Sequence, residues 1–307
     1  NNHLPATYPR TSPLKNIISV AATDRNDAIA YFSNYGLGTV HIGAPGVAIT
    51  SLGITGDSAY SSMSGTSMAT PHVAGAVAQL IAKFPSDTAG QIYNRLLACG
   101  DPIASLTQIT LTGARLNLRN ALANTTGRPF NDDFARARVI AATDFAIQST
   151  LASAAAESSN ISDGIANGPA VWYRVSVPVD GTVTLTTSGS SFDTLLGVYT
   201  GESIAALTAV ATHDDASESD KTSRITFEAT AGVNYYIAAA GKSGAEGYLR
   251  LAMTGPVAND DLANATNLTG IGVMGMRGHN RTATKEPGEA NHAGNAGGKS
   301  VWAKFTP

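Results

Sequence analysis

The hydrophobic positions of the first 124 residues follow two alternating patterns. A nearly continuous, β-branched run at residues 15–24 predicts a buried strand of the kind found in parallel sheets. A run of small apolar residues at 73–84 predicts a helix that is buried nearly all round. Further strand pieces are expected at 28–32, 40–42 and 47–51, and further helices after Pro85 and from about Asn117. Strands that alternate with helices predict an α/β domain, a partial parallel sheet with helices, over residues 1–124.

The pattern changes after the linker NTTGRP at 124–129, whose Thr, Gly and Pro residues are typical of a connection between domains. Runs such as TVTLTT at 182–187 and RITFEAT at 224–230 alternate by two, as half-buried strands do. Strands are expected at 171–177, 181–187, 195–199, 209–212, 223–228, 234–239 and 248–254. This spacing predicts an all-β antiparallel sandwich or jelly-roll module at residues 128–256.

The sequence then repeats itself. NDDFARARVI begins at Asn131 and NDDLANATNL at Asn259, while Trp172 in AVW has its counterpart at Trp302 in SVW. One whole β module is therefore followed by the opening of a second at residues 257–307. We expect that second copy to be truncated, because a sandwich lacking most of its strands cannot close its core.

Composition excludes several classes of function. The net charge of −3 gives no electrostatic case for binding nucleic acid. No apolar run approaches the ~20 residues of a membrane span. The single cysteine, Cys99, forms no internal disulfide and is interpreted as a small buried apolar residue. The chain does not begin with Met, and we expect it to be truncated at its N-terminus.

The stretch that points to chemistry is GTSMATPHVAG, at residues 65–75. Gly65 permits a tight turn, and Ser67 stands where the following helix begins. Backbone N–H groups at such a helix start are unpaired and can face a developing oxyanion. A serine in this position is more often only a helix cap, so position alone does not make it a nucleophile.

The whole string closely resembles the active-site serine motif of subtilisin-like serine proteases, the subtilases. NIISVAATDRNDAIAYFSNYG at 16–36, APGVAITSL at 44–52 and ARLNLRNALA at 114–123 resemble the neighbouring segments of that family in the same order. The resemblance covers about the first 124 residues. It implies a secreted serine endopeptidase with Ser67 as the nucleophile, a protein or peptide substrate, and a monomer.

A serine nucleophile needs a base and an orienting carboxylate, and in subtilases both precede the serine in H-G-T and D-[ST]-G contexts. Neither string occurs here. His72 lies five residues after Ser67 and so points about 140° away on one helix; the resemblance makes it a structural histidine. His41 lies in a strand-like run, and His3 cannot be interpreted. The family's oxyanion asparagine also precedes the serine, and neither Asn1 nor Asn2 is assigned to that role. Because the base, the carboxylate and this asparagine are not identified, the chain resembles the C-terminal half of a catalytic domain.

The β module, with FDTLLGVYTG and NYYIAAAG, resembles the bacterial pre-peptidase C-terminal domain. In related collagenase domains an Asn–Asp pair at the start binds calcium, so the resemblance makes calcium the candidate cofactor and Asn131, Asp132 and Asp133 its ligands. The open alternative is a turn or cap, which Asn and Asp also favour. Glu286, Glu289 and His292 form a second acidic group, which is interpreted as a solvated loop. Asp214 and Asp215 are interpreted as a turn, and together with Asp193 they are the next candidates for calcium.

Two functions from different classes remain. The first is the secreted serine endopeptidase, with β modules that bind substrate or a surface or are removed during maturation. The second is a non-catalytic, calcium-dependent binding protein that uses a degenerate protease domain as a scaffold. The undamaged motif around Ser67 argues against decay of the site and favours the first.

Overall fold

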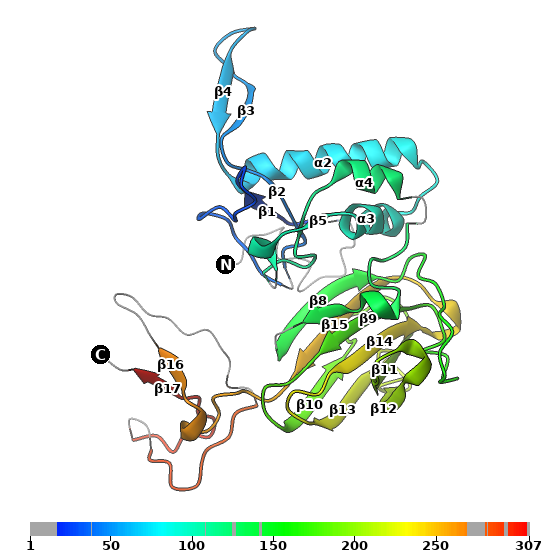
Figure 1. Cartoon of the computed structure of the whole chain (residues 1–307), viewed down its shortest axis with the longest axis vertical. Helices are drawn as coiled ribbons and strands as arrows, with labels where there is room; N and C mark the ends of the chain where they lie inside the picture. Colours follow the sequence, from blue (N-terminus) through cyan, green and yellow to red (C-terminus); the bar gives the residue numbers. More distant parts are fainter. Residues whose placement is uncertain are drawn as a thin grey trace.

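The computed structural model describes residues 17–37, 39–107, 109–124, 127–140, 143–268, 280, 282–291 and 294–305. It is a mixed α/β structure with several sheets and few helices (Figure 1). The expectations about Asn1, Asn2, His3 and His292 fall outside these residues.

The N-terminal sheet is built from short strands in the order β1-β2-β6-β5. These are β1 Val20–Thr23, β2 Ile42–Pro45, β5 Asp101–Pro102 and β6 Ala114–Arg115. β1 runs parallel to β2, and β2 runs parallel to β6. The run at 15–24 is therefore a parallel strand in its second half, and its Val20, Ala21, Ala22 and Thr23 are buried, as its hydrophobicity predicts.

The strand expected at 28–32 is wrong. Only Ile29 forms a bridge, to Thr23, because the chain turns sharply just before it. The Asp24 side chain accepts the N–H groups of Asn26 and Ala28, and Asp27 adopts a φ of 62°. An aspartate that caps its own turn in this way competes with strand formation.

The helices begin where their capping residues lie. They are α2 Thr66–Lys83, α3 Ala89–Ala98 and α4 Leu118–Ala123. Thr88 and Gln91 form a reciprocal capping box at the start of α3, and the Asn117 side chain accepts the Asn120 N–H at the start of α4. The helices expected after Pro85 and from about Asn117 are thus confirmed.

The expectation that α2 is buried nearly all round is wrong. Ala69, Val73, Ala76 and Leu80 are buried against the sheet, whereas Ala74, Gly75 and Ala78 on the opposite side are exposed. A Cβ atom placed on Gly75 would meet nothing within 4 Å. Among the described residues no element covers this second face of the helix, which carries small apolar residues and the polar Gln79.

The β3 Ile49–Leu52 and β4 Tyr60–Met63 strands form a separate antiparallel hairpin. It projects away from the sheet just before α2 (Figure 1). Its apolar side chains are largely open to solvent: Leu52 is 73%, Tyr60 71% and Met63 55% exposed. The hairpin thus exposes an apolar surface in the N-terminal part, as does the open face of α2.

Residues 138–254 form two further sheets, in the orders β13-β10-β15-β8 and β12-β11-β14-β9-β7. All neighbours are antiparallel except β7 and β9. The strands are β7 Arg138–Ile140, β8 Asp144–Thr150, β9 Ala170–Val175, β10 Gly181–Thr186, β11 Thr194–Thr200, β12 Thr208–His213, β13 Arg224–Ala229, β14 Tyr235–Gly241 and β15 Tyr248–Thr254. Each of the seven expected strands lies within two residues of its expected bounds; β7 and β8 were not expected. Short 3-10 helices occur at Ala104–Leu106, Phe134–Arg136, Ile204–Ala206, Lys242–Gly244 and Leu262–Asn264.

Helix α3 joins the N-terminal part to these sheets. The Asn94 side-chain amide donates to the Ala152 carbonyl at 2.8 Å, and the Gln91 amide donates to the Ser153 hydroxyl at 2.9 Å. Buried residues of the helices and of both sheets, from Leu80 and Leu96 to Ile147 and Leu251, belong to one hydrophobic cluster. Burial of apolar surface therefore holds the two parts together as well as each part separately.

The two copies of the sequence repeat share their opening contacts. Asn131 Nδ2 donates to the Trp172 carbonyl at 2.8 Å, and Asn259 Nδ2 donates to the Trp302 carbonyl at 2.9 Å. In the first copy β7 pairs in parallel with β9, and in the second β16 Thr266–Leu268 pairs in parallel with β17 Ala303–Phe305. Equivalent residues thus make equivalent backbone pairs.

The Glu286 region is a loop, as expected, and Glu286 has a counterpart in the first copy of the repeat, Glu157. Glu286 accepts the N–H of Leu262 at 2.9 Å. Glu157 accepts the N–H of Phe134 in the same way at 2.6 Å. Each carboxylate caps the short 3-10 helix that follows an Asn-Asp-Asp sequence. A negative group is favourable there because the start of a helix carries a partial positive charge.

Candidate functional site

The turn before α2 places Ser67 at the carboxyl end of the parallel strand β2. The Gly65 N–H donates to the Gly46 carbonyl at 2.8 Å, and the Ala48 N–H donates to the Ser64 hydroxyl at 2.9 Å. A Cβ atom on Gly46 would lie 2.8 Å from the Gly65 carbonyl oxygen, so only glycine permits this close approach. The glycines of the motif therefore fix the start of the helix against the end of the strand, where open α/β sheets bind ligands.

Ser67 is exposed and is the second residue of α2. Its hydroxyl makes no hydrogen bond to any described residue, and it does not cap the helix, whose N-cap is Gly65. Within the described part of the chain, the N–H groups of Thr66 and Ser67 also have no acceptor. An exposed hydroxyl beside unpaired N–H groups at the positive end of an 18-residue helix can attack a carbonyl and stabilise the resulting oxyanion.

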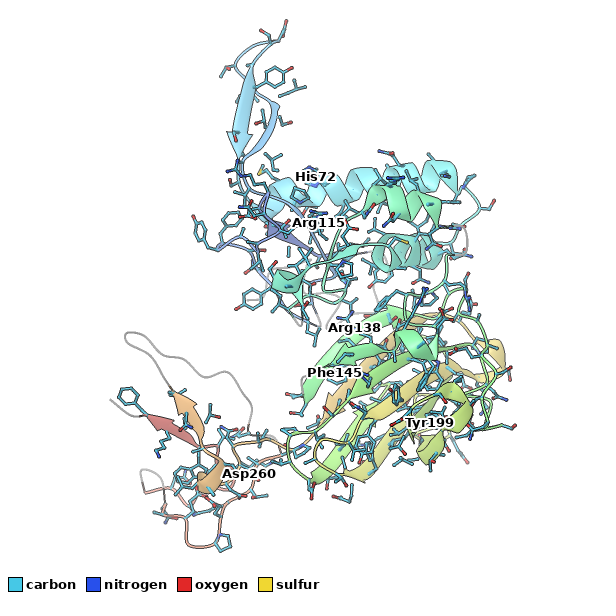
Figure 2. The ribbon with its side chains drawn as sticks, in the orientation of Figure 1. His72, Arg115, Arg138, Phe145, Tyr199 and Asp260 are labelled. Carbon is cyan, nitrogen blue, oxygen red and sulfur yellow. The ribbon has the colours of Figure 1, made fainter. Side chains whose placement is uncertain are left out.

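His72 does not serve as a base for Ser67. It is exposed, and its Nδ1 lies 2.9 Å from the Met68 carbonyl oxygen one helical turn before it (Figure 2). This agrees with the angular separation expected on one helix. Of the described histidines, none hydrogen-bonds Ser67.

His41 is a structural residue just before β2, as its strand-like context predicts. It is 3% exposed, its Nδ1 accepts the Ser19 N–H at 2.9 Å, and Tyr93 packs edge-on to its ring at 5.7 Å. Burial lowers its pKa from 6.5 to about 4, and the hydrogen bond to Ser19 opposes this shift. His41 is therefore neutral near pH 7, with its proton on Nε2.

A groove of about 480 Å³ lies between the β3–β4 hairpin and the first turns of α2. Its walls include Leu52, Met63, Met68 and His72. These walls include Met68, the residue after Ser67, but not Ser67 itself. It offers apolar side chains and free strand edges to an extended peptide.

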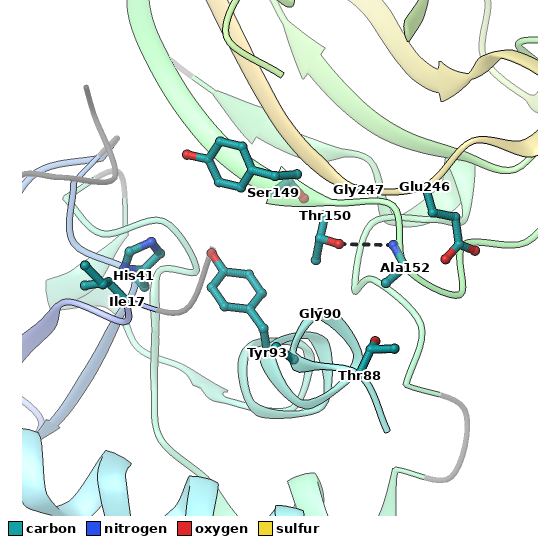
Figure 3. A pocket seen from close by; sticks show the side chains of 12 residues that line it. Ile17, His41, Thr88, Gly90, Tyr93, Ser149, Thr150, Ala152, Glu246 and Gly247 are labelled. Atoms are coloured by element: carbon teal, nitrogen blue, oxygen red, sulfur yellow. Dashed lines mark hydrogen bonds between the residues drawn. The ribbon is translucent and has the colours of Figure 1, made fainter. Parts of the chain in front are cut away.

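A second cavity, of about 300 Å³, lies between α3 and the β8–β15 edge of the sheet (Figure 3). Its walls include His41, Thr88, Gly90, Tyr93, Thr150, Glu246 and Tyr248. The Thr150 hydroxyl accepts the Ala152 N–H at 3.1 Å on one side. Ser67 does not line this cavity, so it is separate from the candidate nucleophile. No local sequence pattern indicates this cavity, because its walls come from segments more than 100 residues apart.

The Asn131-Asp132-Asp133 cluster is largely satisfied by protein groups. Asp132 is 3% exposed, pairs with Arg128 at 2.6 Å and accepts the Ala155 N–H at 3.4 Å. Burial raises the pKa of Asp132, and Arg128 opposes the shift. Asp133 lies 3.9 Å from Arg128 and 3.8 Å from Arg136. The mutual repulsion of the two carboxylates is thus relieved in part by arginines.

Among the described residues, one group of three acids could converge on a metal ion: Asp193, Asp214 and Asp215, whose carboxylate oxygens all lie within 4.8 Å of one another. Lys242 pairs with Asp214 at 2.6 Å, and Lys221 pairs with Asp215 at 2.5 Å. The two lysines balance most of the negative charge of this group. In the described part of the chain, no helix is long and apolar enough to cross a membrane.

Comparison with known proteins finds similarity in the N-terminal part of the chain. The model of the subtilase family matches residues 1–135. Subtilisin Savinase of Lederbergia lenta is 51% identical over 81 residues, which are 26% of this chain and 29% of that protein. The extracellular serine proteinase of Thermus sp. is 39% identical over 102 residues, 33% of this chain and 25% of that protein. The thermostable alkaline protease of Halalkalibacterium halodurans is 49% identical over 80 residues, 26% of this chain and 21% of that protein. The chain thus spans less than a third of the length of these relatives.

Proposed function

We propose that this chain is the C-terminal part of a secreted serine endopeptidase in which Ser67 attacks the scissile peptide carbonyl. The observation that carries the proposal is the exposed, unpaired hydroxyl of Ser67 at the start of α2, within a segment that matches the subtilase family. The names of the relatives, serine and alkaline proteases, support peptide hydrolysis, and the extracellular relative supports secretion.

The chemistry follows from the geometry of the helix start. The Ser67 oxygen would form a bond to the carbonyl carbon while its proton passes to a histidine base. The carbonyl oxygen becomes an oxyanion that accepts the Ser67 N–H. Collapse of this intermediate breaks the C–N bond, and the base returns the proton to the leaving amine. Water then hydrolyses the acyl-enzyme by the same steps in reverse order.

The base and its orienting aspartate are proposed to precede residue 1 in a longer protein. His72 is committed to the Met68 carbonyl and His41 is buried away from Ser67, so neither supplies the base. The open apolar face of α2, at Ala74, Gly75 and Ala78, supports this view. In the longer protein that face would be covered by the part of the catalytic domain that carries the base.

The sheets at 138–254 are proposed to form a pre-peptidase-like β-sandwich module at 128–256 that binds substrate or a surface or is removed during maturation. A second, truncated copy at 257–307 is supported by the shared contacts of Asn131 and Asn259. Calcium is proposed to bind the first module at Asn131, Asp132 and Asp133. For this, Arg128 must give up its contact with Asp132.

The rival proposal is a non-catalytic binding protein built on a degenerate protease scaffold. Measuring peptide hydrolysis by the longer protein distinguishes the two proposals. The Ser67→Ala variant is compared with Ser62→Ala as a matched control. Ser62 is also an exposed serine, but it lies on β4. The endopeptidase loses about three or more powers of ten in kcat/KM on Ser67→Ala and keeps its activity on Ser62→Ala. Equal activity of the two variants would rule out Ser67 as the nucleophile.

A further inference from the structure

The cavity between α3 and the β8–β15 edge takes no part in the proposed peptide hydrolysis, because Ser67 does not line it (Figure 3). Its volume is about 300 Å³, which is at the lower end of the usual range for ligand pockets. Liquid water takes up about 30 Å³ per molecule, so the cavity has room for a small organic molecule of about ten non-hydrogen atoms.

One wall of the cavity carries two hydrogen-bond donors that no described residue uses. His41 is 3% exposed, and because its Nδ1 accepts the Ser19 N–H, its Nε2 carries the proton. Neither this Nε2–H nor the Tyr93 hydroxyl has a hydrogen-bond partner in the described part of the chain. The two rings pack edge to face, with their centroids 5.7 Å apart (Figure 3). Two unused donors this close together suit a ligand that brings an acceptor oxygen.

The charges around the cavity exclude an anionic ligand. Burial lowers the pKa of His41 to about 4 and raises the pKa values of Tyr93 and Tyr248, so all three side chains are uncharged near pH 7. The described residues of the wall include no lysine or arginine. A ligand carboxylate would therefore lose its hydration without gaining a cationic partner.

A cationic ligand gains little here. Glu246 is the only acid among the described residues of the wall, and it is exposed. It already accepts the Ser153 N–H at 3.2 Å. Because water screens an exposed ion pair, its contribution to binding is small. An uncharged ligand therefore fits the wall best.

The shape and composition of the wall favour an aromatic body. The rings of His41, Tyr93 and Tyr248 line the cavity, and aromatic rings pack favourably edge to face or in offset stacks. Gly90 brings α3 close to the sheets, since a Cβ atom there would lie 3.0 Å from the Ala152 Cβ. The cavity is thus narrow on this side, which suits a flat ring.

We propose that this cavity binds a small uncharged phenol or aromatic alcohol, whose oxygen accepts hydrogen bonds from His41 and Tyr93 and whose ring packs against the tyrosines. Helix α3 belongs to the N-terminal part and β8 and β15 to the sheets, so the bound molecule contacts both. The inference is independent of whether Ser67 is a nucleophile.

Calorimetric titration of the 307-residue chain at pH 7 tests the proposal with three related ligands. 4-Bromophenol is expected to bind one site with a Kd of about 1 mM or below, as its size allows. Bromobenzene lacks the oxygen and should bind about tenfold more weakly. 4-Bromobenzoate carries a negative charge and should show no saturable binding.

A conservative variant tests the role of the Tyr93 hydroxyl. Tyr93→Phe should weaken the binding of 4-bromophenol about fivefold and leave that of bromobenzene unchanged, because only a hydrogen bond is lost. Tyr60→Phe is the matched control, since Tyr60 is exposed on β4 and does not line the cavity, and it should change neither affinity. Absence of saturable binding of 4-bromophenol, or equal affinities for 4-bromophenol and bromobenzene, would overturn the proposal.

A second measurement needs no variant. Crystals of the unsubstituted chain soaked in 4-bromophenol should show the anomalous signal of bromine between α3 and β15, with the phenol oxygen within hydrogen-bond distance of the Tyr93 hydroxyl. A bromine signal only at other surfaces would show binding at crystal concentration only, and this outcome too would overturn the assignment of the cavity.

Discussion

The Nδ1 atom of His72 lies 2.9 Å from the carbonyl oxygen of Met68, within the helix that carries Ser67 in its first turn. The nearest histidine in sequence is thereby directed along the helix and away from the serine hydroxyl. His41, the next described histidine, is buried beside Ser19 and Tyr93. The serine therefore has the backbone geometry of a nucleophile but lacks a base among the described residues.

We predict from this that the 307-residue chain does not turn over peptide substrates. Loss of one member of a catalytic triad typically lowers kcat by several powers of ten, because the triad acts as a unit. Hydrolysis of a fluorogenic peptide by the purified chain measures this, with Ser67→Ala as the background. Steady turnover above that background would mean that a base is present within the chain.

The open face of α2 gives a second prediction. Ala74→Glu should change the free energy of unfolding of this chain by no more than about 0.5 kcal/mol, because Ala74 is exposed. In the longer protein the same change should prevent folding or abolish activity, because it buries an unpaired charge against the covering segment. Gln79→Glu, at a polar exposed position of the same helix, is the control and should be tolerated in both. If Ala74→Glu is tolerated in the longer protein, this face is not covered there.

His41 predicts a pH dependence of stability. Its pKa is about 4 in the folded chain, against 6.5 for an ordinary histidine, because it is buried. Between these values the unfolded state binds the additional proton, so the free energy of unfolding falls as the pH falls from 6.5 to 4. The full loss is about 3 kcal/mol.

Denaturant unfolding at pH 7 and pH 4 checks this prediction. His41→Asn keeps a hydrogen-bond acceptor but cannot titrate. Between pH 7 and pH 4 its free energy of unfolding should therefore fall by about 3 kcal/mol less than that of the unsubstituted chain. His72→Asn is the control, because His72 is exposed, and it should behave like the unsubstituted chain. The same loss in the His41 variant and the unsubstituted chain would contradict the account.

Calcium should raise the melting temperature of the chain if it binds at Asn131, Asp132 and Asp133. A ligand that binds only the folded state adds about 2.7 kcal/mol at a hundredfold excess over its Kd. Melts in millimolar calcium and in chelator should differ for the unsubstituted chain, and Asp132→Ala with Asp133→Ala should remove the difference. If the two melts coincide, the cluster only caps a turn. A shift that survives the double substitution would direct attention to Asp193, Asp214 and Asp215.

Several structures that depend on nearby residues could be predicted from the sequence. The starts of α3 and α4 follow from Thr88 and Asn117, whose side chains cap the next turn. The strands from β9 to β15 follow from alternation by two and from turn residues. The assignment of Ser67 as the nucleophile rests on a long, local motif and stays a prediction.

What the sequence did not reveal depends on contacts between distant segments. The short strand β7 carries too few residues for a periodic signal, and it forms because it pairs with β9, 35 residues further on in the Arg138–Tyr173 register. The shared role of Glu157 and Glu286 appears only when each is placed against the backbone of a 3-10 helix. The burial of Arg138, which donates to the Thr110 carbonyl, depends on the packing of the N-terminal part against the sheets, and no local pattern indicates it.

Ser67 is proposed to be the nucleophile of an endopeptidase whose base lies outside residues 1–307. Its most direct test is labelling with a serine-directed fluorophosphonate, with the modified residue mapped by mass spectrometry. In the longer protein the account predicts stoichiometric labelling at Ser67 that is lost on Ser67→Ala and kept on Ser62→Ala, and only trace labelling of the 307-residue chain. Stoichiometric labelling of the 307-residue chain at Ser67, or no labelling of the longer protein at this residue, would contradict it.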